Sequence, residues 1–254
     1  LVTLANKCNG TQLLPNVVST EQQSLIVVKK LLAIAVSSIT YLRGLFPEKA
    51  YGKKYVEEQK VMILREERTC PGASQIVQWL VYSTKPQWEI PVLYSTLWPN
   101  PFPLSWLDYL FSKVTECYQF KVQYTEKGPK IDFERYSFVN VSTKKSSILL
   151  VRKLYTLMQN LGPLPENVCL NMKLSYYDDV TPQDYQPPGF MEGDSDSMQF
   201  EKEPVNLTMG EVVTPFHTLK VGVTTERERL EQEGGTVTKI SSQQVRPEAD
   251  INLG

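Results

Sequence analysis

The residue types that most often do chemistry are few and scattered in this sequence. There is one histidine, His217, and there are four cysteines without a C-x-x-C pair among them: Cys8, Cys70, Cys117 and Cys169. That spacing gives no support to metal ligation. No nucleophile motif lies near His217, which falls in an alternating pattern, so we expect a structural histidine. Asp178 and Asp179 are adjacent, and adjacent residues at a strand end point to opposite faces. The sequence therefore predicts neither a catalytic centre nor a cofactor or metal site.

Charge and cysteine content narrow the class of protein. The 254 residues include 27 basic and 28 acidic side chains. That balance lacks the basic excess of a nucleic-acid-binding domain, so we expect any contact with chromatin to be indirect. An even number of cysteines and three sequons, at Asn9, Asn140 and Asn206, leave a secreted binding glycoprotein as the alternative. The low cysteine density favours buried free thiols instead. Because the chain begins at Leu1 without a methionine, we expect either a fragment or an incomplete gene model.

The predicted elements are organised around residues 144–177. Apolar residues cover about half of the helical wheel from Lys144 to Leu161, which predicts a helix between a sheet and other helices. We expect Gly162 to end this helix in the left-handed conformation, and the prolines that follow prevent its continuation. Apolar and polar residues then alternate from Val168 to Tyr177, as in a half-buried strand. The apolar face of that strand carries Val168, Leu170, Met172, Leu174 and Tyr176.

Further helices and strands are predicted before this point. A helix is expected from Thr20 to Leu42, with Thr20 as its N-cap and Gln23 three residues later. Its uninterrupted apolar stretch is much shorter than the ~20 residues of a membrane span, so we expect a core helix and no membrane contact. Residues 131–140 have no clear pattern and predict an irregular connection. The remaining predictions are a hairpin at Val56 and Val61–Leu64, a helix over Ala73–Val81 and a strand over Glu116–Thr125.

Both ends of the chain have weaker patterns. Residues 1–18 lack a clear period and predict a flexible arm, and residues 230–254 are polar, which predicts a disordered tail. Val205–Met209 and His217–Val223 alternate, but they follow the core after a long connection. We therefore expect these two segments to form an arm that wraps around the domain outside its central sheet.

Residues 82–113 differ in composition from the rest of the chain. The segment is rich in tryptophan and contains Pro86, Pro91, Pro99, Pro101 and Pro103. Prolines at this density argue against a regular helix or a central strand through most of it, so we expect an irregular segment. Two interpretations stay open: an aromatic binding loop, and a misjoined or alternative exon.

Six stretches carry a resemblance to a known family: STEQQSLIVVKKLLAIAVSSITYLRGLFPEKAYG (19–52), ILREERTCPG (63–72), ECYQFKVQYTEKGP (116–129), KKSSILLVRKLYTLMQNLGPLP (144–165), KLSYYDDVTPQDYQPPGF (173–190) and TPFHTLKVGVTTERER (214–229). Together they resemble the HORMA domain, and most closely the meiosis-specific HORMA proteins of animals. The resemblance covers most of residues 19–229 and leaves 82–113 as a divergent segment. It implies an α+β fold in which three helices pack on a mostly antiparallel sheet with a C-terminal safety-belt arm.

The resemblance also implies a function. Members of this family hold a short closure-motif peptide against an edge strand, here Val168–Tyr177, beneath the safety belt, here 180–225. The belt residues are then Tyr185, Phe190, Leu219, Val221 and Val223. The implied role is a non-enzymatic adaptor of meiotic chromosome axes in the nucleus, which supports double-strand-break formation, homologue pairing, synapsis and checkpoint surveillance. The implied partners are closure-motif peptides of axis or other HORMA proteins and an AAA+ remodelling ATPase that engages residues 1–18.

Overall fold

The computed structural model describes residues 14, 18–56, 59–83, 92–99, 114–124, 133–165, 168–176, 182, 185–186, 190 and 199–231. Its helices are α1 (Glu21–Leu42), α2 (Pro71–Ser83), α4 (Phe133–Asn160) and α5 (Arg227–Glu231), with a 3-10 turn at Glu48–Ala50. Its strands are β1 (Tyr51–Val56), β2 (Gln59–Leu64), β3 (Val92–Pro99), β4 (Glu116–Tyr124), β5 (Val168–Ser175), β6 (Pro204–Val213) and β7 (His217–Glu226).

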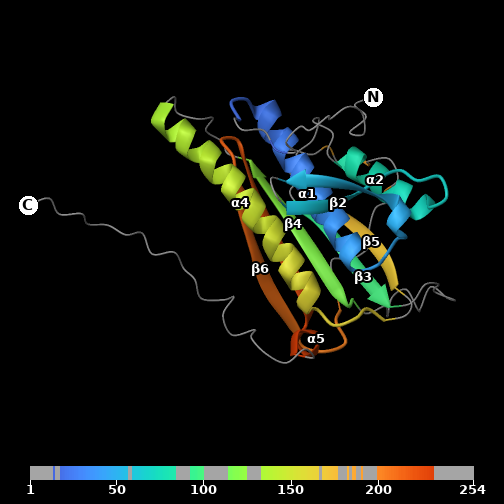
Figure 1. Cartoon of the computed structure of the whole chain (residues 1–254). Coiled ribbons are helices and arrows are strands. Elements are labelled where there is room, and N and C mark those ends of the chain that lie inside the picture. Colours follow the sequence, from blue (N-terminus) through green and yellow to red (C-terminus); the bar gives the residue numbers. More distant parts are fainter. Residues whose placement is uncertain are drawn as a thin grey trace, which may run out of the picture.

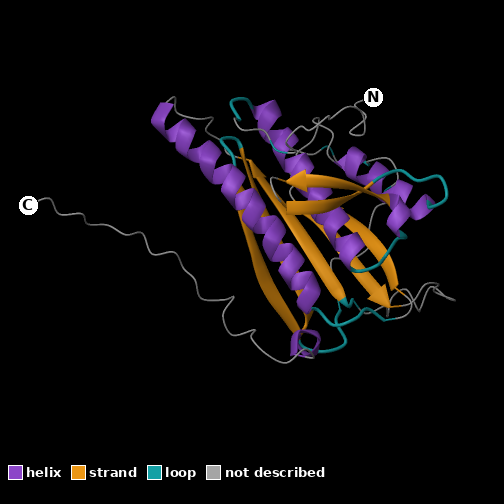
Figure 2. Cartoon of the chain, viewed as in Figure 1, coloured by secondary structure: helices purple, strands orange, loops and turns teal. Residues whose placement is uncertain are grey.

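The strands form one large sheet and one hairpin. The large sheet has the order β5-β3-β4-β7-β6, while β1 and β2 pair with each other, and every pair is antiparallel. Helices α1 and α4 contact each other and cross one face of the large sheet, α4 over β6 and α1 over β7 (Figures 1 and 2). The β1–β2 hairpin packs against α1. The α+β prediction is therefore confirmed.

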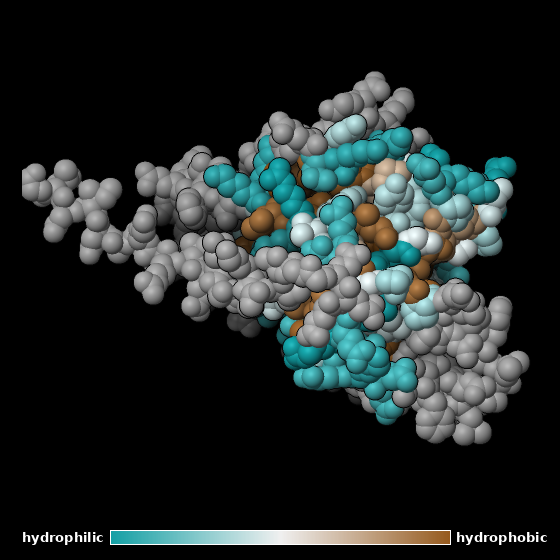
Figure 3. Space-filling view, turned by 60° about the horizontal axis from the view of Figure 1, so that its bottom comes forward, coloured by the Kyte–Doolittle hydropathy of each residue, from teal (hydrophilic) through white to brown (hydrophobic). Residues whose placement is uncertain are grey.

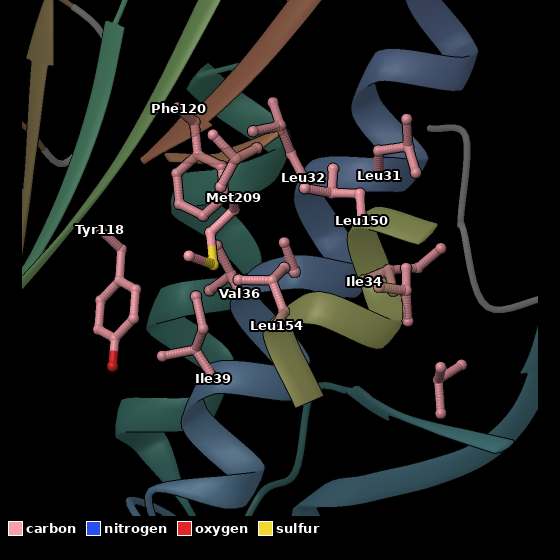
Figure 4. Packing of buried hydrophobic residues seen from close by; sticks show 14 of the residues in the cluster. Leu31, Leu32, Ile34, Val36, Ile39, Tyr118, Phe120, Leu150, Leu154 and Met209 are labelled. Carbon is pink, nitrogen blue, oxygen red and sulfur yellow. The ribbon is translucent and has the colours of Figure 1, made fainter. Parts of the chain in front are cut away.

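The core lies between the two long helices and the sheet. Leu150 and Leu154 of α4 point toward Leu32 and Val36 of α1, and Phe120 and Met209 approach from the sheet (Figure 4). Each of these side chains is at most 5% exposed. Full burial of such side chains contributes roughly 1.5–3 kcal/mol each, which makes this junction the main source of stability.

Helix α1 begins and ends with the capping groups that helices need. Thr20 Oγ1 accepts a hydrogen bond from Gln23 N at 3.2 Å, as predicted. After the C-cap Arg43, Gly44 takes a φ of +67°, a conformation that glycine adopts without strain. By length and composition α1 is apolar enough to cross a membrane, but most of its apolar stretch is buried inside the domain. In this structure it is a core helix.

Helix α4 corrects two predictions. It begins at Phe133, so the irregular connection expected over 131–140 is wrong, because residues 133–143 contain neither proline nor glycine to interrupt the helix. Gly162 does not have a positive φ. The helix ends at Asn160, and Gly162 N donates to Arg229 O at 3.0 Å, so a tertiary contact replaces the expected local cap.

Strand β3 shows that the irregular segment predicted over 82–113 is wrong in part. Residues 92–99 pair with both β4 and β5, Leu93 opposite Phe120 and Leu174, and α2 extends to Ser83. The prolines explain the error, because Pro91 precedes the strand and Pro99 is its last residue. The residues between them are mostly β-branched, aromatic or aliphatic. The other residues of 82–113 lie outside the described part of the chain.

Strands β6 and β7 correct the predicted C-terminal arm. They do alternate as expected, but β7 pairs with β4 inside the large sheet and β6 completes the sheet beyond it. Their expected position outside the central sheet is therefore wrong. Of the predicted N-terminal arm the structure describes Leu14 and Val18, both buried. The predicted tail 230–254 lies outside the described residues except for Leu230 and Glu231 at the end of α5.

Candidate functional site

The edge strand β5 is the best candidate for binding an extended chain. Among the described strands it pairs with β3 alone, and the eight residue pairs from Val92–Ser175 to Pro99–Val168 run without a bulge. Alternate main-chain N–H and C=O groups along its other side have no strand partner among these residues. A sheet edge without a neighbouring strand accepts an added strand.

The opposite edge is less suited to that role. Strand β6 begins with Pro204 and has a register shift between Thr208 and Gly210, where Gly210 has a φ of +143°. Beyond the shift Glu211 and Lys220 form an exposed ion pair at 3.9 Å. Bulges and charges protect sheet edges from further pairing, so β5 and not β6 is the open edge.

Four of the five predicted edge-strand residues lie in the core or pack against it, and the fifth lies just beyond the end of the strand. Met172 is 5% exposed and belongs to the core, and Val168, Leu170 and Leu174 pack partly buried against it. Tyr176 follows the last residue of β5. The domain therefore already covers Val168, Leu170, Met172 and Leu174, and along β5 a bound chain would meet the main chain and not these four side chains.

Two aromatic pairs fix the connection that leaves β5. The rings of Tyr176 and Tyr185 meet edge-on, with centroids 5.4 Å apart. Five residues later Phe190 packs on Trp79 of α2 at 5.8 Å, and Gln186 Nε2 donates to Phe190 O at 2.9 Å. Edge-on and tilted pairs at these distances are favourable aromatic contacts. The predicted belt residues Tyr185 and Phe190 therefore attach the connection to the end of β5 and to α2.

This connection, residues 176–203, joins the two opposite edges of the sheet. It starts at the end of β5, and before β6 it meets the start of β4, where Phe200 forms a parallel bridge with Val114 and Val114 N donates to Gln199 O at 2.7 Å. Ser175 lies level with Val92 and Lys121, whereas Leu170 lies level with Leu97 and Glu116, so the connection begins and ends at opposite ends of the strands. Because its described residues contact α2 and the start of β4, we call residues 176–203 the strap.

Leu219, Val221 and Val223 do not form part of this strap. They lie on β7, are 0%, 2% and 2% exposed, and belong to the hydrophobic core. Their partners across the strand pairs are Val122, Phe120 and Tyr118 of β4. These residues anchor the C-terminal end of the strap in the sheet.

His217 lies in a buried polar cluster that ties β7 to α1. Its Nδ1 is 2.6 Å from Ser24 Oγ, which is 2.5 Å from Thr214 Oγ1, and the Tyr124 ring stacks edge-on at 4.8 Å. Burial lowers the pKa of His217, and the charge of Glu21 opposes this. Ser24 and His217 are 0% and 1% exposed, so no substrate reaches this pair. The arrangement is structural, as the sequence predicted.

A second buried cluster ties α5 to the core. Glu116 is fully buried and accepts from Arg43 Nη2 and Arg229 Nη2, each at 2.6 Å, and from the Tyr118 hydroxyl at 2.5 Å. Burial first, and then the carboxylate of Glu116, raise the pKa of Tyr118 well above its usual value. Arg229 also donates to the carbonyl of Gly162 at 3.0 Å. Charge-assisted bonds from two arginines to one carboxylate hold three distant segments together.

The described surface offers no other candidate. No group of three histidine, cysteine or acidic residues able to hold a metal occurs in the described ranges. Burial raises the pKa of Cys117 to about 11, so its thiol stays protonated. Exposed large apolar residues are dispersed over five elements: Ile26, Tyr55, Val81, Leu149 and Val213. On the face in Figure 3, hydrophobic residues likewise appear in small groups among hydrophilic ones.

Comparison with known families decides the identity of this fold. The HORMA domain family matches residues 24–87 and 107–217. The chain belongs to the HORMA domain family. It is 60% identical to HORMA domain-containing protein 1 of Danio rerio over 228 residues, and this alignment covers 87% of this chain and 62% of that protein. To the Homo sapiens protein of the same name it is 50% identical over 240 residues, which are 91% of this chain and 59% of that protein. The chain thus spans about 60% of the length of these relatives.

Solved HORMA structures share the fold. C. elegans HTP-2 bound to the HIM-3 closure motif aligns with a TM-score of 0.67 and 19% identity, covering 84% of this chain and 94% of that one. C. elegans HTP-1 bound to HTP-3 motif-1 gives 0.66 and 20%, with the same coverage. A chain of the mitotic checkpoint complex gives 0.60 and 15%, covering 82% of this chain and 97% of that one.

The structure adds site residues that the sequence reasoning missed. Trp79 is the partner of Phe190, and Arg43, Glu116 and Arg229 form the buried ion cluster. Trp79 looked like one apolar residue of a helix, and no local pattern marks charges that meet across 73 and 113 positions. The acidic residue at the start of the predicted strand 116–125 was the only available signal.

Proposed function

We propose that this HORMA domain is a non-catalytic adaptor that binds a closure-motif peptide as an added strand on β5, beneath the strap 176–203. The observation that supports this proposal is the edge of β5, which has no bulge, together with a strap whose described residues contact Trp79 of α2 and Val114 before β4. Each main-chain hydrogen bond to the peptide contributes about 0.5–1.5 kcal/mol. Tyr185 and Phe190 are proposed as the strap residues beside the peptide, and Leu219, Val221 and Val223 as its anchor in the sheet.

The identity of relatives named HORMA domain-containing protein 1 supports a place for this adaptor on meiotic chromosome axes in the nucleus. There it would support double-strand-break formation, homologue pairing, synapsis and checkpoint surveillance. Its partners would be closure motifs of axis proteins or of other HORMA proteins. An AAA+ remodelling ATPase engaging residues 1–18 would release them, and contact with chromatin would be indirect. A tagged chain expressed in meiotic cells should label chromosome axes, and uniform or extranuclear staining would contradict this placement.

Peptide binding is tested by selecting a phage-displayed library of random linear peptides on the folded domain and measuring hydrogen exchange with an enriched peptide. Added main-chain pairing should slow exchange at alternate amides of 168–175 and leave the β6 edge unchanged. The matched control is the same peptide N-methylated at alternate residues. Methylation of either the odd or the even residues gives two such peptides. One of the two should lose binding, because it lacks the main-chain N–H donors that face β5. Protection at β6, or equal binding of both N-methylated peptides, would refute the site.

A further inference from the structure

The hydroxyl of Tyr176 is a buried polar group without a use in the domain itself. Its oxygen is inaccessible to solvent and has no hydrogen-bond partner in the structure. Tyr176 follows directly after Ser175, the last residue of β5, and its ring lies edge-on against Tyr185 of the strap. The unpaired group therefore belongs to the residue that follows the open strand and contacts the strap.

An unpaired buried hydroxyl is costly, since most buried polar atoms in folded proteins have a partner. Burial raises the pKa of Tyr176, and the neighbouring Tyr185 adds to the effect. The phenol thus keeps its proton at neutral pH and is able to donate. Three other side chains with buried unpartnered oxygens, Ser38, Tyr51 and Tyr155, belong to α1, β1 and α4. None of those elements is a strand of the open edge.

We propose that the Tyr176 hydroxyl donates a hydrogen bond to an oxygen of the peptide bound along β5. This inference rests on the proposed function. A peptide that continues its pairing past Ser175 runs beside Tyr176, because each strand residue advances only about 3.3 Å. The Tyr176–Tyr185 and Trp79–Phe190 pairs hold the strap at this end of the edge, so the acceptor meets the hydroxyl in a site shielded from water.

The test removes the hydroxyl oxygen of Tyr176. Tyr176→Phe keeps the ring contact with Tyr185 and removes only the hydroxyl, and Tyr155→Phe is the matched control because it removes a buried unpartnered hydroxyl from α4. Neither variant should unfold more easily than the parent, since neither loses a hydrogen bond. Both are used beside the parent domain in the same random-peptide selection, and enriched peptides are measured by fluorescence polarisation.

Peptides enriched on the parent should bind Tyr176→Phe roughly tenfold more weakly for a neutral acceptor and up to roughly a hundredfold for a carboxylate, and Tyr155→Phe should bind like the parent. A side-chain acceptor also appears as an oxygen-bearing residue enriched at one position with the parent and not with Tyr176→Phe. A main-chain acceptor leaves the selected sequences unchanged. Equal affinity of Tyr176→Phe and parent overturns this inference alone, whereas no enrichment on the parent overturns the proposed function.

Discussion

Arg227 and Arg229 offer a matched test of the buried ion cluster. Both belong to α5 and both donate to a glutamate, Arg229 to Glu116 at 2.6 Å and Arg227 to Glu203 at 3.1 Å. They differ in burial. The side chains of Arg229 and Glu116 are 11% and 0% exposed, whereas those of Arg227 and Glu203 are 52% and 70% exposed. We compare Arg229→Met with Arg227→Met, which remove the same charge two positions apart.

Removing one member of a buried pair typically costs about 3–5 kcal/mol, because the remaining charge stays desolvated. Glu116 would keep Arg43 and the Tyr118 hydroxyl, so we expect the lower end, about 3 kcal/mol, for Arg229→Met. Gly162 and Pro163 would also lose the guanidinium that their carbonyls accept from. Solvent screens the exposed pair, so Arg227→Met should change the free energy of unfolding too little to measure.

Urea denaturation followed by circular dichroism measures both differences, with equal slopes as the check that the unfolded states are comparable. Equal stability of the two variants would refute the assignment of the cluster as a stabilising tie. A loss for Arg229→Met that persists when Glu116 is already Gln would instead show that the carbonyl contacts, and not the ion pair, carry the effect.

Three further results are expected. Leu219→Asp should unfold the domain, because a charge replaces a fully buried core side chain, whereas Lys220→Asp on the exposed face should leave its circular dichroism spectrum unchanged. The lowered pKa of His217 means that its contribution is complete above about pH 6.5 and is lost as the pH falls toward the folded-state value, so His217→Gln should flatten the dependence of the urea midpoint on pH. Gly44→Ala should cost about 1 kcal/mol at a φ of +67°, and Gly52→Ala, without a positive φ, should cost less; equal thermal midpoints would contradict this.

Sequence reasoning succeeds where structure is set by local pattern. Strands β4 and β5 were predicted within two residues of their observed ends because one face is apolar and one polar. The Thr20 cap was predicted because it depends on residues three positions apart. Strand β3 was missed because prolines at its ends were counted against its interior.

What it cannot provide is the set of contacts between distant segments. The end of α4 depends on Arg229, which accepts from Gly162 N across 67 positions, and no local pattern contains that information. The place of β7 was wrong for the same reason. Apolar and polar residues alternate along β7, which predicts a strand. The alternation does not determine which strand it pairs with, and here that strand is β4.

The position of β7 also determines when this sheet is completed during synthesis. Strand β7 fills the gap between β4 and β6, yet Val223 emerges about a hundred residues after its partner Tyr118. At about 5–20 residues per second, β4 waits on the order of ten seconds with one edge unpaired. During that interval Tyr118 and Phe120, fully buried in the finished domain, lack the strand beside them. Nascent chains should therefore depend on chaperones until residues 217–226 leave the ribosome, and chains shortened before β7 should be recovered mainly as aggregates.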